Sequence, residues 1–152
     1  MYKAYDSLSD GLKETLGRMR AVHSAHYAFG TKSGDKQSGG TGGRIGNSDV
    51  ADALENPVHP VVITHPMSGR KALYVNGAFT LHFENWSVED SVPLLEYLYA
   101  IAIRDEFVTK FRWQPGSVAF WDNRATWHYA QNDYQGQRRE MHRITIEGCA
   151  LS

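Results

Sequence analysis

The sequence predicts a mainly β domain with flanking helices, an α+β fold, on three observations. The first is a carboxyl-terminal stretch, residues 112–148, whose residues are typical of strand, turn, strand, loop and strand. The second is a series of strand-type segments that begins at residue 57. The third is the helical spacing of apolar residues over 1–22 and 88–102. With 152 residues, the chain is long enough to bury a core, and we expect a single domain over 1–152.

Composition and charge argue against several classes of protein. The chain is 41% hydrophobic and 22% charged, with a net charge of −1 and a pI near 6.6, which does not favour nucleic acid or an anionic membrane as a partner. Its single cysteine, Cys149, rules out an intrachain disulfide and a cysteine-based zinc site. No segment has the pattern of a signal peptide or of a membrane span. We therefore expect a cytoplasmic protein and leave a homo-oligomer open.

The first 50 residues divide into a predicted helix and a predicted loop. Leucines 8, 12 and 16 and Met19 recur at helical spacing, so we expect a helix over 1–22 with this stripe in the core. Residues 30–50 contain seven glycines and almost no apolar residue, which predicts a flexible loop. The loop matches neither the P-loop nor the dinucleotide fingerprint, so it gives no support to a phosphate site.

The middle of the chain alternates strands and a helix. Residues 59–65 are expected to form a strand that turns at 66–69 and pairs with 71–76 as a hairpin, and 79–83 forms the next strand. A helix follows over 88–102, with its buried face formed by Leu94, Leu95, Leu98 and Ile101. Ser87 and Asp90 have the spacing of a capping box, although Pro93 favours a regular helix that starts nearer Ser91.

The carboxyl-terminal stretch is predicted to contain strands at 108–113, 118–121, 126–130 and 138–147, with a turn at 114–116. Side chains alternate along a strand, so Arg139 and Arg143 share one face and lie about 13 Å apart. A guanidinium on an inward face is costly unless it meets an anion, and arginine suits a two-pronged grip on a carboxylate. The plainer alternative is a solvated strand face with salt-bridged arginines.

The sequence motifs themselves resemble a known family. WDNR (121–124), HYA (128–130), QRR (137–139) and MHR (141–143) are similar to the carboxyl-terminal signature of the taurine catabolism dioxygenases, which depend on Fe(II) and 2-oxoglutarate. The resemblance continues upstream through HPVV (59–62), THP (64–66), GRKALYVN (69–76) and FT (79–80). It implies a double-stranded β-helix, the jelly roll of cupin-like proteins, in which two histidines and one carboxylate hold the iron.

The resemblance also implies roles for individual residues. His128 matches the distal iron ligand, Arg139 the arginine that pairs with the 2-oxoglutarate C5 carboxylate, and Arg143 the arginine that faces the substrate anion. Phe79 and Phe29 match aromatic residues of the substrate pocket, whereas Ala28 stands where the family has a small polar residue. The implied reaction uses O2 to hydroxylate a small anionic substrate, an organosulfonate, and releases succinate and CO2. The glycine-rich loop matches a variable segment near the active-site mouth, so we hypothesise a mobile lid.

One expected motif is missing. In the family, the His-x-Asp motif that supplies the other two iron ligands lies upstream of the segment that matches Tyr2–Asp6, so the sequence looks truncated and its jelly roll incomplete at the amino terminus. The chain itself offers one His-x-Glu, His82-Phe83-Glu84, which with His128 gives the ligand types of a facial triad. Two alternatives therefore stay open: a catalytically inactive fragment that binds small dicarboxylates, and a compact cupin-like metalloprotein that uses His82, Glu84 and His128.

Overall fold

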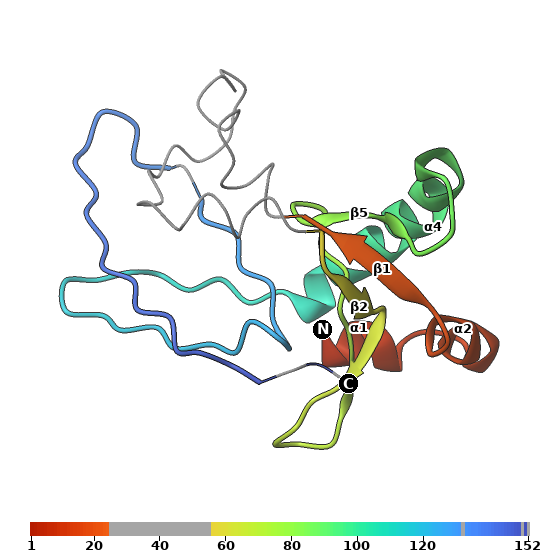
Figure 1. Ribbon diagram of the computed structural model, residues 1–152. Helices are drawn as coiled ribbons and strands as arrows, with labels where there is room; N and C mark the ends of the chain where they lie inside the picture. The colour runs from red at the N-terminus through yellow and green to blue at the C-terminus, as the bar shows by residue number, and fades with distance from the viewer. Residues whose placement is uncertain (25–55, 132, 150, 152) are drawn as a thin grey trace.

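The computed structural model describes residues 1–24, 56–131, 133–149 and 151. In the described part, two small antiparallel sheets and the helices α1, α2 and α4 surround a common core, from which the carboxyl-terminal third of the chain extends (Figure 1). The predicted combination of strands and flanking helices is therefore present. The predicted loop at 30–50, and the lid hypothesis with it, lie outside the described residues.

The amino-terminal segment forms two short helices and then a strand. Helix α1 spans Tyr2–Asp6, α2 spans Asp10–Leu16, and β1 follows at Arg20–His23. The predicted helix over 1–22 is thus divided into two short helices that end at Leu16, and it is wrong for the residues that form β1. The chain leaves α2 at Gly17, and β1 then pairs with a strand on each side, so tertiary pairing outweighs the local preference for helix.

The strands form two sheets. In the first, the order is β2–β1–β5, with β2 at Val58–Pro60 and β5 at Thr80–Phe83, both antiparallel to β1. In the second, β3 at Val62–Thr64 pairs with β4 at Lys71–Leu73, which confirms the predicted hairpin. The single strand predicted over 59–65 is divided between the two sheets at Val61, whose N–H donates to Met19 and whose C=O accepts from Tyr74.

Helix α4 spans Val88–Ala102, as predicted, and a 3₁₀ turn, η3, follows at Asp105–Phe107. The amino terminus of α4 is capped by Ser87, whose Oγ accepts a hydrogen bond of 3.0 Å from the Asp90 N–H. The expectation of a later start near Ser91 is wrong, because Pro93 lies inside the regular helix. Pro93 removes one helical hydrogen bond near the start of the helix, while Ser91 ties this turn to β5 by accepting from the Phe83 N–H at 3.0 Å.

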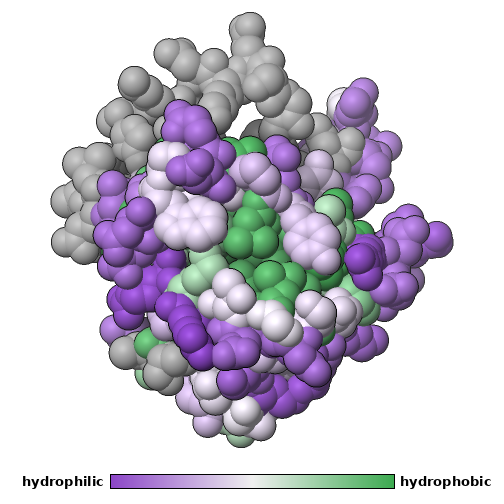
Figure 2. All heavy atoms as spheres, turned by 90° about the vertical axis from the view of Figure 1, so that its right-hand side faces the viewer, coloured by the Kyte–Doolittle hydropathy of each residue, from purple (hydrophilic) through white to green (hydrophobic). Residues whose placement is uncertain are grey.

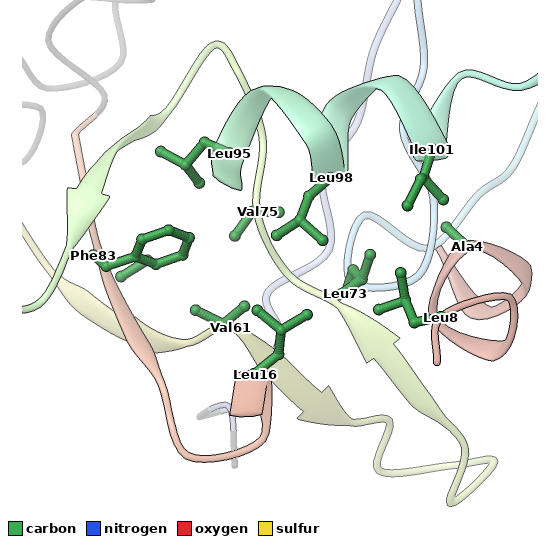
Figure 3. Close-up of a cluster of buried hydrophobic side chains, with 11 residues drawn as sticks. Ala4, Leu8, Leu16, Val61, Leu73, Val75, Phe83, Leu95, Leu98 and Ile101 are labelled. Carbon is green, nitrogen blue, oxygen red and sulfur yellow. The ribbon is translucent and has the colours of Figure 1, made fainter. Parts of the chain in front are cut away.

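The core lies between α4 and the sheets and includes the amino-terminal helices (Figure 3). The predicted stripe of the first 19 residues belongs to it: Leu8 and Leu16 are buried, and Leu12 and Met19 pack against it. The predicted face of α4 is also buried through Leu95, Leu98 and Ile101, with Leu94 partly buried. The remaining members of the cluster are Ala4, Ala21, Val61, Leu73, Val75 and Phe83.

The carboxyl-terminal third differs most from the prediction. Residues 108–149, where described, contain turns near Gly116, Ala125 and Gly136 but no strand, so the strands predicted at 108–113, 118–121, 126–130 and 138–147 are not present. Extended backbone becomes a strand only when it has a hydrogen-bonding partner, and this segment forms no ladder among the described residues. Side chains that would line a sheet stay exposed, at 88% for Val118, 87% for Phe120 and 91% for Ile144. A closed jelly roll is accordingly not seen in the described part of the chain.

On the face where α4 and α2 lie, apolar side chains gather in an area framed by hydrophilic ones (Figure 2). Exposed apolar residues at the start of α4 are Val88 and Val92, at 52% and 40%. No helix in the described ranges is long and apolar enough to cross a membrane.

We predict that His23 makes the stability of this fold depend on pH. His23 is 8% exposed, and its Nε2 has no hydrogen-bond partner among the described residues. Burial, followed by the charge of His59, lowers its pKa from 6.5 to about 4. Between these values the unfolded chain binds the proton and the folded chain does not, so the free energy of unfolding falls as the pH falls. We expect the free energy of unfolding, measured by urea unfolding, to fall by about 2–3 kcal/mol from pH 7.5 to pH 4.5.

The matched variants are His23→Asn, which removes the titrating ring, and His142→Asn, which changes an exposed histidine. We expect His23→Asn to reduce the difference between the two pH values and His142→Asn to keep it. An equal pH dependence in His23→Asn and the wild type would contradict the prediction.

Candidate functional site

The candidate site begins with a short turn that carries His128. The N–H groups of Ala125 and Thr126 donate to the C=O of Asp122 at 3.1 and 3.0 Å, and the Thr126 hydroxyl donates to the same oxygen at 2.6 Å. The turn places the His128 ring against Trp121, with ring centroids 4.9 Å apart. The indole N–H of Trp121 donates to the side chain of Asn123 at 2.9 Å. The His128 imidazole is thus exposed on one side and packed against Trp121 on the other.

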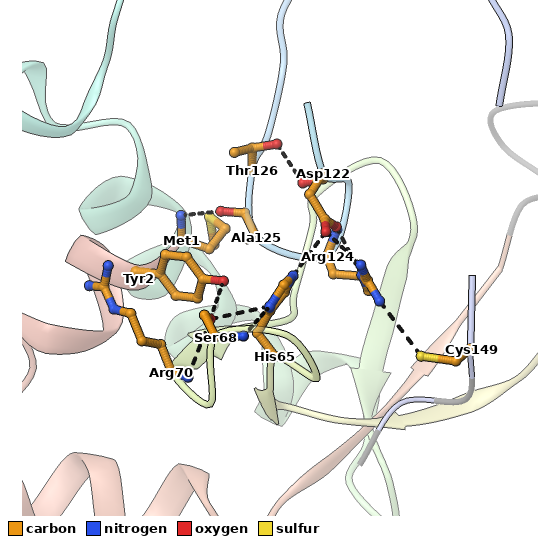
Figure 4. Close-up of polar contacts among 10 residues, drawn as sticks. All are labelled: Met1, Tyr2, His65, Ser68, Arg70, Asp122, Arg124, Ala125, Thr126 and Cys149. Carbon is orange, nitrogen blue, oxygen red and sulfur yellow. Dashed lines mark hydrogen bonds and ion pairs between the residues drawn. The ribbon is translucent and has the colours of Figure 1, made fainter. Parts of the chain in front are cut away.

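Asp122 is the centre of the polar network shown in Figure 4. Its carboxylate accepts from the Arg124 side chain at two positions, Nε at 2.9 Å and Nη2 at 2.6 Å, and from the Arg124 backbone N–H at 2.9 Å. It also lies 2.9 Å from Nε2 of His65. The hydrogen bonds from Arg124, more than the one from His65, hold the pKa of Asp122 well below its ordinary value. Arg124 in return has a raised pKa, chiefly because it donates to Asp122.

His65 joins this network to the turn of the β3–β4 hairpin. The Ser68 N–H lies 3.2 Å from Nδ1 of His65, so Nδ1 is the acceptor and the proton lies on Nε2, where it is donated to Asp122. The Ser68 hydroxyl lies at the same distance from Nδ1 and 3.0 Å from the Tyr2 hydroxyl. Nothing in the sequence indicates the bond between His65 and Asp122, which lie 57 residues apart.

Two of the predicted anion-binding residues lie in the extended carboxyl-terminal segment. Arg139 is exposed, with its guanidinium carbon 5.2 Å from the centre of the Tyr134 ring. Arg143 is also exposed, and neither arginine has a carboxylate partner among the described residues. Arg138, between them and the turn, pairs with Glu140. Since no strand forms here, the shared face predicted for Arg139 and Arg143 stays a prediction.

The predicted pocket aromatics are only partly visible. Phe79 is half-buried just before β5, where its C=O accepts from the Ser24 N–H at 2.8 Å. Phe29 and Ala28 lie outside the described residues. The structure therefore places Phe79 next to the end of β1, and its role in a substrate pocket stays a prediction.

The structure does not bring together the alternative triad of His82, Glu84 and His128. His82 uses Nδ1 for the C=O of Phe83 at 2.8 Å, and Glu84 lies 3.5 Å from Nε of Arg20. Within the described ranges, no three His, Cys, Asp or Glu side chains are grouped so that they could hold a metal ion. A facial triad needs three ligands, so the described residues provide at most His128 and do not by themselves fit an iron centre.

Comparison with known proteins covers nearly the whole chain. The family model described as "Taurine catabolism dioxygenase TauD, TfdA family" matches residues 1–145. The chain is 39% identical to an alkylsulfatase of Acinetobacter baylyi, with 95% of this chain and 45% of the relative covered. It is 36% identical to an alpha-ketoglutarate-dependent sulfate ester dioxygenase of Pseudomonas putida, with 95% and 47% covered. The chain thus spans about half the length of these curated relatives.

A solved structure is similar to this chain in three dimensions as well. The chain is similar to the crystal structure of a taurine dioxygenase from Burkholderia xenovorans, with a TM-score of 0.61 and 32% sequence identity. The likeness covers 82% of this chain and 35% of that one. The fold of the described residues is therefore that of one part of a larger relative.

We predict that Arg124→Met raises the pKa of Asp122 toward its ordinary value of 3.8, because the variant loses both side-chain hydrogen bonds from the guanidinium. The measurement is a pH titration of the Asp122 carboxyl carbon by NMR. Arg138→Met serves as the control, since Arg138 pairs with Glu140 instead. An Asp122 carboxyl that stays ionised to the same pH in Arg124→Met would contradict the assignment.

Proposed function

Because the chain belongs to the TauD, TfdA family of taurine catabolism dioxygenases, we propose that it carries part of the active site of an Fe(II)- and 2-oxoglutarate-dependent dioxygenase that acts on a small anionic substrate. The observation that carries the proposal is the family match over residues 1–145, a range that contains His128, Arg139 and Arg143. The name of the relative at 36% identity, an alpha-ketoglutarate-dependent sulfate ester dioxygenase, supports the same reaction class, and the name of the alkylsulfatase at 39% identity supports an anionic sulfur-containing substrate.

In this proposal His128 is one ligand of the iron, Arg139 binds the C5 carboxylate of 2-oxoglutarate, and Arg143 orients the anionic group of the substrate. The described structure supports the two anion-binding roles in one respect. Arg139 and Arg143 have no carboxylate partner among the described residues, whereas Arg124 and Arg138 pair with Asp122 and Glu140. An unpaired guanidinium keeps its full set of donors for a ligand carboxylate, sulfonate or sulfate.

We propose an organosulfonate as the substrate and regard a sulfate ester as the nearest related class. Both end in a tetrahedral sulfur group with exposed anionic oxygens, which suits a planar guanidinium such as that of Arg143. Phe79, with Phe29, would contact the apolar part of the substrate. Hydroxylation would be accompanied by conversion of 2-oxoglutarate and O2 to succinate and CO2. The single domain, the cytoplasmic location and any homo-oligomer stay predictions.

A second candidate function follows from the absence of a three-ligand group among the described residues. A chain with free anion-binding arginines but no complete metal centre would bind 2-oxoglutarate or another small dicarboxylate without turning it over. The two candidates share the role of Arg139 and differ only in whether the chain binds iron. They are therefore separated by measuring dicarboxylate binding and iron binding independently.

We predict that Arg139→Met weakens binding of 2-oxoglutarate to the metal-free chain by roughly 10- to 100-fold, because a hydrogen-bonded charge pair contributes about 1.5–3 kcal/mol. Isothermal titration calorimetry measures the dissociation constant. The matched control is Arg138→Met, which removes a neighbouring exposed arginine that pairs with Glu140. Equal affinities in the two variants would exclude Arg139 from the site.

Iron binding decides between the two candidates. Fe(II) and 2-oxoglutarate are added anaerobically to the chain, and the weak visible charge-transfer band of the iron chelate is recorded. A band, followed by succinate release with O2 and a panel of sulfonates and sulfate esters, supports the dioxygenase. A folded chain that binds 2-oxoglutarate without a band supports the second candidate for this chain.

A further inference from the structure

The turn that carries His128 is attached to the rest of the molecule at few places. Apart from the bond that the Val108 N–H donates to the C=O of Asp105 at 3.2 Å, where the segment begins, three hydrogen bonds and ring contacts between described residues join residues 108–149 to the remainder. His65 donates to Asp122, the Met1 amino group donates to the C=O of Ala125 at 2.7 Å, and the Tyr99 and Trp127 rings lie 5.8 Å apart. All three end within residues 122–127, immediately before His128.

Of these three contacts, the one from His65 starts from a buried side chain with hydrogen-bond partners at both ring nitrogens. The His65 side chain is 8% exposed, and its backbone N–H donates to the C=O of Arg70 at 2.8 Å across the β3–β4 turn. Its Nδ1 is held by the Ser68 N–H, so both ring nitrogens have a fixed partner. The ring can therefore move only if the hairpin turn moves as well.

The contacts of His65 could also be read as a Ser-His-Asp nucleophile site made of Ser68, His65 and Asp122, but the hydrogen bonds argue against it. The lone pair of Nδ1, which would take the hydroxyl proton, already accepts the Ser68 backbone N–H at 3.2 Å. The same nitrogen is therefore not free to act as a base. The arrangement fits support of the neighbouring turn better than catalysis of its own.

Asp122, which accepts the hydrogen bond from His65, influences the position of His128 in two ways. Its backbone C=O accepts from Ala125 and Thr126 and so closes the turn that leads to His128. Its preceding residue, Trp121, packs against the His128 ring at 4.9 Å. A displacement of Asp122 would thus move both the chain that leads to the imidazole and the indole on which the imidazole rests.

We propose that His65 and Asp122 are positioning residues for His128. The hydrogen bond between them fixes the 121–128 turn to the β3–β4 hairpin and so sets the place of the imidazole. The role of His128 as an iron ligand rests on the proposed function. Neither residue is proposed as a metal ligand: His65 acts through Asp122, and Asp122 acts through the turn and Trp121. Such outer support is what keeps a ligating histidine in a defined orientation.

The test uses His65→Asn in the full chain without metal. The asparagine Oδ1 can still accept the Ser68 N–H in place of Nδ1, but residue 65 no longer donates to Asp122, which keeps only its bonds from Arg124. The readout is the ring-current shift that Trp121 imposes on the carbon-bound protons of His128, recorded by ¹H–¹³C NMR, with the methyl signals of Leu73 and Leu98 as reporters of the core. We expect the His128 shift to be lost while the methyl signals stay in place.

His142→Asn is the matched control, because it makes the same exchange at an exposed histidine of the same segment. We expect it to leave the His128 shift unchanged. A His128 shift that also persists in His65→Asn would overturn the proposal. A merely structural role of His65 would move the core methyl signals, which the proposal does not expect.

If His65→Asn does not fold, Asp122→Glu carries the test. It keeps a carboxylate for His65 and Arg124 but lengthens the arm by one methylene, so the turn must shift and the His128 ring-current shift must change. An unchanged shift in this folded variant would overturn the proposal. Because the readout needs neither iron nor turnover, a failure of the proposed dioxygenase activity leaves its outcome unaffected.

Discussion

Pairing of β1 on both of its edges is the constraint on which the rest of this structure depends. Residues 20–23 contact two segments that follow much later in the chain, with Ala21 opposite both His59 and Phe83. This arrangement brings the amino-terminal helices, the β3–β4 hairpin and α4 around one apolar cluster (Figures 1 and 3). Residues 108–149, which have no partner strand among the described residues, form neither a helix nor a strand where they are described.

The sequence is most informative where structure depends on near neighbours. Helix α4 is specified by its Ser87 cap and by apolar residues at helical spacing, and the β3–β4 hairpin by a turn in which Gly69 takes a positive φ of 66°. The sequence predicts both elements. The late helix start inferred from Pro93 is wrong because one lost hydrogen bond near the first turns is tolerated when the cap and the buried face are strong.

The sequence is least informative where structure depends on distant partners. Residues 20–22 are predicted as the end of a helix, because the pairing of β1 with 58–60 and 80–83 leaves no local trace. The bond between His65 and Asp122 escapes prediction for the same reason. The opposite error occurs after residue 108, where β-branched and aromatic residues predict strands that have no partner strand among the described residues. The preference of such residues for strands reflects packing on a sheet, so it does not form a strand where no sheet is present.

The parts of the candidate site therefore differ in how far the described structure has fixed them. An anion-binding arginine must be held in place, because each free arginine side chain has about 2 kcal/mol of rotamer entropy to lose. Arg139 rests on Tyr134 alone and Arg143 has no polar or ring partner in the described structure, so neither is held. His128 is different, because Trp121, the turn closed at Asp122 and the buried His65 form a chain of contacts from its ring to the β3–β4 hairpin. The two arginines would gain comparable order only if 138–147 paired as a strand, since pairing fixes the face on which each side chain lies.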